Sequence, residues 1–203
     1  MQIYFSSIKI LTSLTEENSI RYLGIYIDSN LNWKSHINYI AKKVKHSIGT
    51  LSKLRYYLNS KTLLDLYYAL VNPFLTYCII AWSNTYQTSL QTLFVLQKKA
   101  IRIITFSRFI EHTSPLFKDL NVIKLSDEAT VHIAVFMYKI KNQLLLTNFN
   151  GFFFTSINET HNYSTRLSSK MMNALPKTRT NYGIFHIRYQ GAKIWNAISD
   201  NTD

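Results

Sequence analysis

Glycine, proline and cysteine are all scarce in this chain of 203 residues, which holds five glycines, three prolines and one cysteine. The glycines are dispersed, which excludes the glycine-rich loop that cradles phosphates in many nucleotide-binding proteins. The single cysteine, Cys78, excludes a disulfide within the chain and favours a reducing compartment, either cytosolic or nuclear. No signal peptide is evident, and the best membrane candidate, Pro73 to Trp82, is too short to span a bilayer.

Acidic residues are scarce as well. Asp and Glu number 11 against 23 Lys and Arg, which gives a net charge of +12. Asp65 is the only acid from Ser29 to Ile110, and no acid lies between Thr160 and Ser199. Such long stretches of uncompensated positive charge favour contact with a polyanion, either nucleic acid or an anionic membrane surface. For any single lysine, an ordinary solvated helix face is the alternative.

The residue patterns of several enzyme classes are missing. The chain contains no Asp-Asp pair, and its adjacent acids are Glu16-Glu17 in a predicted connection and Asp127-Glu128 at a predicted helix start. It contains no Gly-x-Ser-x-Gly turn of the kind that presents a nucleophilic serine. Its six histidines show no spacing with one another or with Cys78 that is typical of a zinc site. We therefore expect no catalytic residue, no metal site and no cofactor in this chain.

The residue patterns that the chain does contain predict a mainly α fold with a small N-terminal β hairpin. Gln2 to Ile10 and Ile20 to Ile27 are rich in β-branched and aromatic residues, which is typical of strands. Asp28 follows the second strand and is expected to stabilise a turn. From Ile37 to Leu58 the apolar residues recur every three or four positions, which predicts a helix. Its inward stripe is Ile37, Ile40, Val44, Ile48, Leu51, Leu54 and Leu58.

Further helices are expected along the rest of the chain. Asn59 is expected to cap the second helix, and Pro73 to open a mostly buried helix that runs to Trp82. Leu90 to Ile104 predicts a helix whose inward residues are Leu93, Leu96, Ala100, Ile101 and Ile104. Ser126 is expected to cap a helix with Val131, Val135 and Tyr138 on its core side. The tail from His161 is mixed and closes with a helix at Ala192 to Ile198, and the expected core anchors are Trp33, Trp82 and Trp195.

Four phrases of the sequence, taken in order, resemble a known family. They are Tyr22 to Asp28 with Leu31-Asn32-Trp33, Leu66 to Tyr77 with Ala81-Trp82, Leu96 to Ile104, and His161 to Arg166 with Gly191 to Asn196. Together they span about residues 20 to 198. This ordered set resembles the C-terminal part of reverse transcriptases from LINE-type, jockey-like non-LTR retrotransposons: the end of the palm, the thumb and the region after it.

The resemblance implies that the parent enzyme is an RNA-directed DNA polymerase whose palm aspartates hold two divalent metals, usually Mg²⁺. Two cations about 4 Å apart stabilise both the attacking and the leaving oxygen. In this family the aspartates lie in an aromatic-any-Asp-Asp phrase upstream of the junction, and this sequence lacks that phrase. We therefore expect a fragment without polymerase activity of its own. The resemblance divides it into a palm hairpin remnant (1–33), a thumb-like helical bundle (34–107) and a post-thumb region (108–203).

Because the thumb of this family packs on the minor-groove side of the primer–template duplex, the resemblance implies sequence-tolerant contact with RNA, DNA or an RNA–DNA hybrid. Tyr56 and Tyr57 are candidates for stacking on sugar or base, although their place beside an apolar stripe favours the core. The candidate phosphate contacts are Lys42, Lys43, Lys45, Lys53, Arg55, Lys98, Lys99, Arg102, Arg166 and Arg179.

Two readings without a nucleic-acid role stay open. The first is a helical structural or protein-interaction module, which would self-associate through apolar surface at residues 1–28 that a palm would cover. The second is a membrane-surface helix, since Lys42 to Arg55 is basic and amphipathic. Its apolar stripe is long enough to be needed in the core, so we expect no membrane partner.

Overall fold

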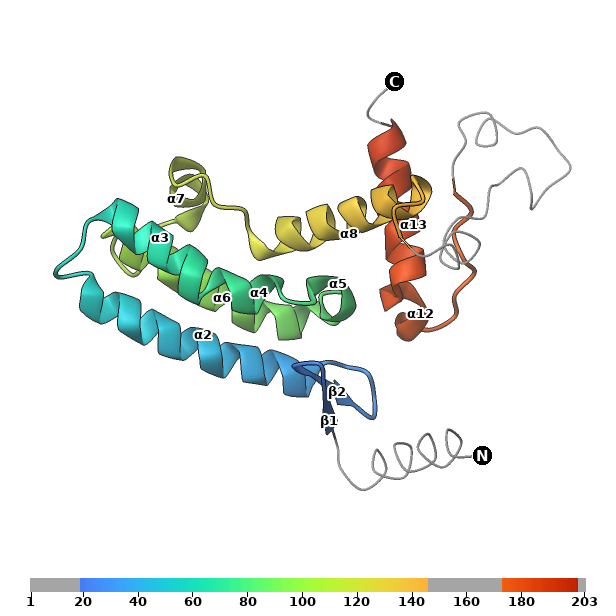
Figure 1. The fold of residues 1–203 in the computed structure, drawn as a ribbon, viewed down its shortest axis with the longest axis horizontal. Coiled ribbons are helices and arrows are strands. Elements are labelled where there is room, and N and C mark those ends of the chain that lie inside the picture. Colours follow the sequence, from blue (N-terminus) through green and yellow to red (C-terminus); the bar gives the residue numbers. More distant parts are fainter. Residues whose placement is uncertain (1–18, 146–172, 201–203) are drawn as a thin grey trace, which may run out of the picture. The chain divides into compact units, whose positions relative to one another are not determined.

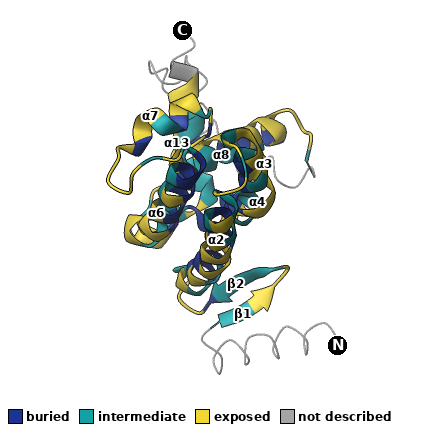
Figure 2. Ribbon diagram, turned by 90° about the vertical axis from the view of Figure 1, so that its left-hand side faces the viewer, coloured by how far each residue is buried: buried dark blue, intermediate teal, exposed yellow. Residues whose placement is uncertain are grey.

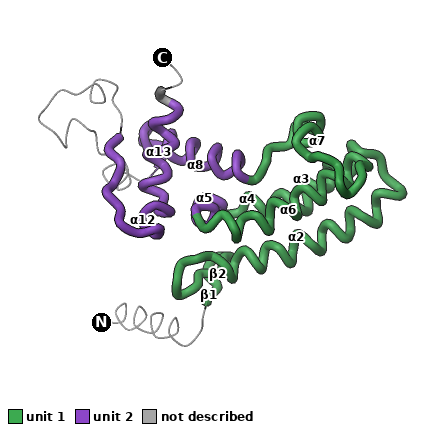
Figure 3. The backbone as a smooth tube through the Cα atoms, turned by 180° about the vertical axis from the view of Figure 1, so that it is seen from behind, with its two compact units in different colours: residues 1–78, 85–125 green, residues 79–84, 126–203 purple. Residues whose placement is uncertain are grey.

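The computed structural model of the protein describes residues 19–145 and 173–200, which are mainly helical with one small antiparallel hairpin (Figure 1). The predicted mainly α fold with an N-terminal hairpin is confirmed. The chain forms two compact units (Figure 3): unit 1 comprises residues 1–78 and 85–125, and unit 2 comprises residues 79–84 and 126–203. The boundaries predicted after residues 33 and 107 concern functional parts rather than compact units, and they stay a prediction.

The hairpin pairs β1 (Ser19–Tyr22) with β2 (Ile25–Asp28), with Tyr22 opposite Ile25. Leu23 and Gly24 connect the strands with φ angles of 45° and 84°. Two positive φ angles are typical of the two-residue hairpin turn that matches the twist of the strands. The single strand predicted from Ile20 to Ile27 is therefore wrong, because the run contains the turn and most of both strands. The other predicted strand, Gln2 to Ile10, lies outside the described residues.

Unit 1 is built around α2 (Lys34–Leu54) and α6 (Gln87–Ile104), which lie side by side in the same direction. At their starts, the Thr85 hydroxyl donates to the Asn32 carbonyl at 3.0 Å. At their ends, the Arg55 guanidinium lies 5.1 Å from the centre of the Phe106 ring. The inward residues predicted for α6 are all buried, as are those predicted for α2 except the half-buried Leu54 and Leu58 (Figure 2).

The remaining helices of unit 1 are α3 (Ser60–Leu70), α4 (Asn72–Thr76) and α7 (Thr113–Asp119). The Asn59 side chain accepts a hydrogen bond from the Thr62 amide at 2.9 Å, which confirms the predicted cap of α3. Pro73 lies in the first turn of α4, as predicted. The continuous helix predicted from Pro73 to Trp82 is wrong, because Cys78 has a φ of 51° and separates α4 from α5 (Ile79–Trp82).

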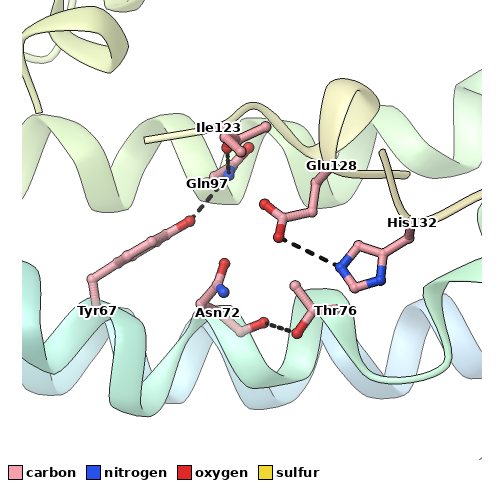
Figure 4. A network of polar contacts seen from close by, with 7 residues as sticks. All are labelled: Tyr67, Asn72, Thr76, Gln97, Ile123, Glu128 and His132. Atoms are coloured by element: carbon pink, nitrogen blue, oxygen red, sulfur yellow. Dashed lines mark hydrogen bonds and ion pairs between the residues drawn. The ribbon is translucent and has the colours of Figure 1, made fainter. Parts of the chain in front are cut away.

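A buried glutamine joins three segments of unit 1 (Figure 4). The Gln97 amide nitrogen donates to the Tyr67 hydroxyl and to the Ile123 carbonyl, both at 3.0 Å. Its carbonyl oxygen accepts from the Leu125 amide, also at 3.0 Å. These bonds tie α6 to α3 and to the segment that follows α7. A polar side chain in the core is stable here because it has three partners.

Unit 2 contains α5, most of α8 (Leu125–Lys141), α12 (Asn181–Phe185) and α13 (Ile187–Asp200). Its buried cluster is Ile133, Met137 and Ile140, with Phe136, Ile187, Ile194 and Trp195 packed against it. The core side predicted for α8 is wrong, because Val131, Val135 and Tyr138 are about half exposed. Ser126 does not cap α8 but lies inside it, where its hydroxyl donates to Asp127. Trp82 is buried, whereas Trp33 and Trp195 are half-buried.

Candidate nucleic-acid interface

Three lysines form a line along the outer face of α2, and we call Lys42, Lys45 and Lys53 the lysine stripe. At 100° per residue, these positions lie within about 80° of one another around the helix. All three side chains are exposed, while the opposite face of α2 is buried against unit 1. The stripe is about 16 Å long, because eleven residues separate its ends at a rise of about 1.5 Å each. It spans roughly five nucleotide steps of a duplex at about 3.4 Å per step.

Within residues 19–145 and 173–200, no carboxylate forms an ion pair with a stripe lysine. Gly49 lies on the same line, and no atom lies within 4 Å of the position that a Cβ there would occupy. Lys43 lies to one side of the stripe, with its ammonium 5.7 Å from the centre of the Tyr39 ring. The stripe is therefore an open row of positive charge that no described carboxylate neutralises.

Polar contacts around His36 hold the N-terminal end of α2 in place. The Asp28 carboxylate accepts from the Asn32 amide at 2.8 Å, which confirms its predicted role in a turn. The His36 Nδ1 accepts from the Tyr26 amide at 3.4 Å, so β2 is joined to α2. His36 is buried, and this desolvation lowers its pKa from 6.5 to about 4. The Tyr39 ring stacks against His36 and lies 5.1 Å from the ring of Tyr26.

The hairpin turn is held by Tyr77 at the end of α4. The Tyr77 hydroxyl donates to the Leu23 carbonyl at 2.7 Å, and its ring lies 3.5 Å from the place that a Cβ of Gly24 would take. The Tyr77 phenol is a donor at neutral pH because its ordinary pKa is 10, and the charge of the neighbouring Cys78 raises this pKa further. The hairpin is thus anchored through its turn to the residue that follows α4.

Within the described residues of unit 1, the predicted contact residues on α6 do not join the lysine stripe. The Lys98 ammonium lies 4.2 Å from the Phe94 ring centre, and Lys99 is exposed on the same helix. The Arg102 guanidinium donates to the Glu111 carbonyl at 2.9 and 3.1 Å. Arg179 is exposed in unit 2. Arg166 lies outside the described residues.

The far end of α2 carries exposed rings, and we call Tyr56, Tyr57, Phe106 and Phe109 the aromatic tip. Tyr56 and Tyr57 are 86% and 85% exposed, so their predicted place in the core is wrong. The reason is that α2 ends at Leu54, and the residues after it leave the helical stripe. Sequence reasoning missed Phe106 and Phe109, which lie in the loop between α6 and α7. The feature of the sequence that could have identified them is two aromatic residues, Phe106 and Phe109, with no apolar periodicity around them.

Two candidate sites of other kinds were considered in the part of the chain that the structure describes. No group of three His, Cys, Asp or Glu side chains is close enough there to hold a metal ion. No helix among residues 19–145 and 173–200 is both long and apolar enough to cross a membrane.

Comparisons with curated proteins find relatives of one kind. The chain is 29% identical over 122 residues to the RNA-directed DNA polymerase from mobile element jockey of Drosophila funebris, which covers 57% of this chain and 13% of that protein. It is 24% identical over 134 residues to the probable RNA-directed DNA polymerase from transposon BS of Drosophila melanogaster, covering 63% of this chain and 14% of that protein. The jockey polymerase of Drosophila melanogaster matches at 25% over 118 residues, 57% of this chain and 13% of that protein.

The chain therefore spans about one seventh of the length of the curated relatives that it matches. No protein-family model and no solved structure matches it. The predicted resemblance to reverse transcriptases of jockey-like mobile elements is confirmed by these relatives.

Proposed function

We propose that this chain is a thumb-like part of a non-LTR retrotransposon reverse transcriptase and binds the RNA–DNA hybrid through the lysine stripe. The observation that carries the proposal is the stripe itself. Lys42, Lys45 and Lys53 lie in one line on an exposed helix face, and no carboxylate of residues 19–145 and 173–200 forms an ion pair with them. Neutralising phosphates releases their condensed counterions, so an unpaired row of lysines gains free energy on a polyanion.

The shape of the helix supports a duplex rather than a compact anion as the partner. A row about 16 Å long matches several phosphates along one strand, whereas one compact anion is too small to contact both of its ends. Gly49 leaves the middle of the row without a side chain, which lets a duplex approach the backbone closely. An A-form hybrid offers a wide, shallow minor groove that suits contact by backbone and shape.

By itself, this chain performs no nucleotide transfer in our proposal. Two-metal transfer requires carboxylates that hold two cations about 4 Å apart. The 203 residues contain no Asp-Asp pair, and Asp28, the acid nearest the hairpin, has one oxygen engaged by the Asn32 amide. Its contribution to a polymerase is therefore to hold and orient nucleic acid.

The test is fluorescence anisotropy with a labelled blunt RNA–DNA hybrid of about 14 base pairs. The variant is Lys42→Glu/Lys45→Glu/Lys53→Glu, and it should lose roughly 500-fold in affinity at about 0.1 M salt, since each contact contributes about 0.9 log units there. The matched control is Lys118→Glu/Lys139→Glu/Lys193→Glu, which makes the same change of charge at exposed positions on helices other than α2.

The control variant distinguishes binding at the lysine stripe from attraction by the overall charge of the protein. Equal losses in the two variants would show that only net charge attracts the hybrid, and this would contradict the stripe. A folded wild-type chain that does not bind the hybrid would contradict the nucleic-acid function altogether.

A second candidate function is protein interaction, and one observation favours it. Val131, Val135 and Tyr138 recur at intervals of four and three residues, so they form an exposed apolar line along α8. Exposed apolar surface of this kind is typical of contact sites. Sedimentation velocity of the wild-type chain and of Val131→Ser/Val135→Ser tests this: a self-associating wild type and a monomeric variant would support it.

A further inference from the structure

The aromatic tip joins two segments that are about fifty residues apart in the sequence. Tyr56 and Tyr57 follow α2, whereas Phe106 and Phe109 follow α6. The Arg55 guanidinium lies 5.1 Å from the Phe106 ring centre, which brings the two segments to the same end of unit 1 (Figure 1). Rings from both segments are therefore exposed at this one end of unit 1.

The loop that presents Phe106 and Phe109 is ordered by its own hydrogen bonds. The Ser107 amide donates to the Arg102 carbonyl at 3.0 Å, and the Glu111 amide donates to the Arg108 carbonyl at 3.1 Å. The Glu111 carboxylate accepts from the Arg108 amide at 3.2 Å. The loop thus holds its shape while leaving Phe109 79% exposed. It also borders an open pocket of about 650 Å³ that Phe106, Arg108 and Pro115 help to line.

Positive charge lies beside both phenylalanines of the tip. The Arg102 guanidinium lies 5.9 Å from the Phe109 ring centre, and Arg108 is exposed beside it. Arg55 stands beside Phe106 on the other segment. The only acid in this loop, Glu111, is already engaged by a backbone amide. Exposed rings among arginines suit a ligand that has both flat aromatic faces and negative charge.

We infer that the aromatic tip binds unpaired nucleotides of a single-stranded RNA or DNA. Bases stack on Tyr56, Tyr57 and Phe109, and the arginines contact the phosphates between them. The inference rests on the proposed function, because Lys53 of the stripe stands three residues before Tyr56. A strand that leaves a duplex on the stripe therefore reaches the tip directly. A protein partner is disfavoured by three arginines around so small an apolar area, and it becomes an outcome of the test.

The experiment compares a blunt RNA–DNA hybrid with the same hybrid carrying an unpaired extension of about eight nucleotides. One arm uses an RNA extension and the other a DNA extension, which shows which strand the tip accepts. The wild-type chain should bind one or both extended hybrids at least about 10-fold more tightly than the blunt one, as expected for one or two base stacks. A 2-aminopurine in the extension should lose fluorescence on binding, because stacking quenches it.

The key variant is Tyr56→Ala/Tyr57→Ala/Phe109→Ala, which should remove the gain and the quenching while leaving blunt-hybrid affinity within about twofold. These residues are exposed, so the fold should tolerate the change. The matched control, Tyr56→Phe/Tyr57→Phe, keeps the rings and should keep the gain.

Each alternative outcome has its own meaning. If the wild-type chain binds blunt and extended hybrids equally, the inference about the aromatic tip is overturned, while the proposed role of the lysine stripe stands. A gain in affinity that persists in the alanine variant also overturns the inference about the tip. A wild type that self-associates, and becomes monomeric in the alanine variant without any gain from the extension, shows that the surface docks protein instead.

Discussion

The two ends of α2 carry the same kinds of residue, tyrosines beside cationic side chains, but they use them in opposite ways. At the N-terminal end, Tyr26 and Tyr39 contact each other, and Arg21 and Lys43 lie over their rings. At the C-terminal end, Tyr56 and Tyr57 are exposed. The difference lies in the partners that the chain supplies, because β2 and His36 close the first end and nothing comparable covers the second within the described residues. We call the first end, held by contacts among Tyr26, His36 and Tyr39, the frame, whereas the tyrosines at the second end are exposed.

The lysine stripe lies between these ends and depends on both. If the frame holds α2 in place and the tip receives an unpaired strand, then weakening the frame should cost stability, and weakening the tip should cost only binding. The predictions that follow sharpen this contrast through changes in the free energy of unfolding.

The largest effect is expected from Gln97, which joins α3, α6 and the segment after α7. Gln97→Leu should lower the free energy of unfolding by about 3 kcal/mol, since it leaves buried groups such as the Leu125 amide without their partner. Urea denaturation measures this. Gln91→Leu is the control, because Gln91 is exposed on the same helix and should change stability by less than about 0.5 kcal/mol. Equal, small effects would show that Gln97 is not a structural junction.

The next effect concerns the frame and depends on pH. Burial lowers the pKa of His36 from 6.5 to about 4, so the folded protein binds this proton less readily than the unfolded chain. The stability that neutral His36 contributes is therefore fully present above pH 6.5 and is lost as the pH falls from 6.5 toward 4. Between pH 7 and pH 5 the loss from this residue should be about 2 kcal/mol.

Urea denaturation at several pH values checks this, with His36→Gln as the variant whose residue 36 cannot titrate. The difference in unfolding free energy between wild type and variant should shift by that amount between the two pH values. His46→Gln, at an exposed position on the same helix, should follow the wild-type profile. A profile that His36→Gln leaves unchanged would show that His36 is not held neutral by the frame.

The smallest effect concerns two glycines, Gly49 in α2 and Gly24 in the hairpin turn, for which opposite changes in stability are expected. Gly49→Ala should raise the free energy of unfolding by about 1 kcal/mol, because alanine is the better helix former and its methyl group meets no atom. Gly24→Ala should lower it by about 1 kcal/mol, because Gly24 has a φ of 84° at the hairpin turn. Thermal unfolding of both variants checks the signs. A loss of stability in Gly49→Ala would mean that α2 is not a regular helix there.

Sequence reasoning succeeded where a helix has one apolar face. For α2 and α6, a single stripe of residues faces the core, so periodicity alone identified nearly all of the buried positions. It failed for α8, which has two apolar lines, one through Ile133 and Met137 and the other through Val131 and Val135. Periodicity cannot choose between two such lines, because the choice depends on which one other helices cover.

The remaining failures come from single backbone positions. The turn at Leu23-Gly24 is hidden in a run of strand-forming residues, and the break at Cys78 is hidden in an apolar run. The lysine stripe was within reach of sequence reasoning, since helical spacing aligns its residues. The aromatic tip was not, because it exists only where the ends of α2 and α6 meet, and that meeting is a tertiary contact between distant segments.

The most direct test of the central claim is the salt dependence of wild-type affinity for a blunt RNA–DNA hybrid, compared with the variant Lys42→Glu/Lys45→Glu/Lys53→Glu. If about four phosphates are contacted, log affinity should fall against log salt with a slope near −3.6. The variant should have a slope shallower by about 2.7, because three of those contacts are lost. An equal slope in both proteins, or binding that does not weaken with salt, would contradict a nucleic-acid interface on the lysine stripe.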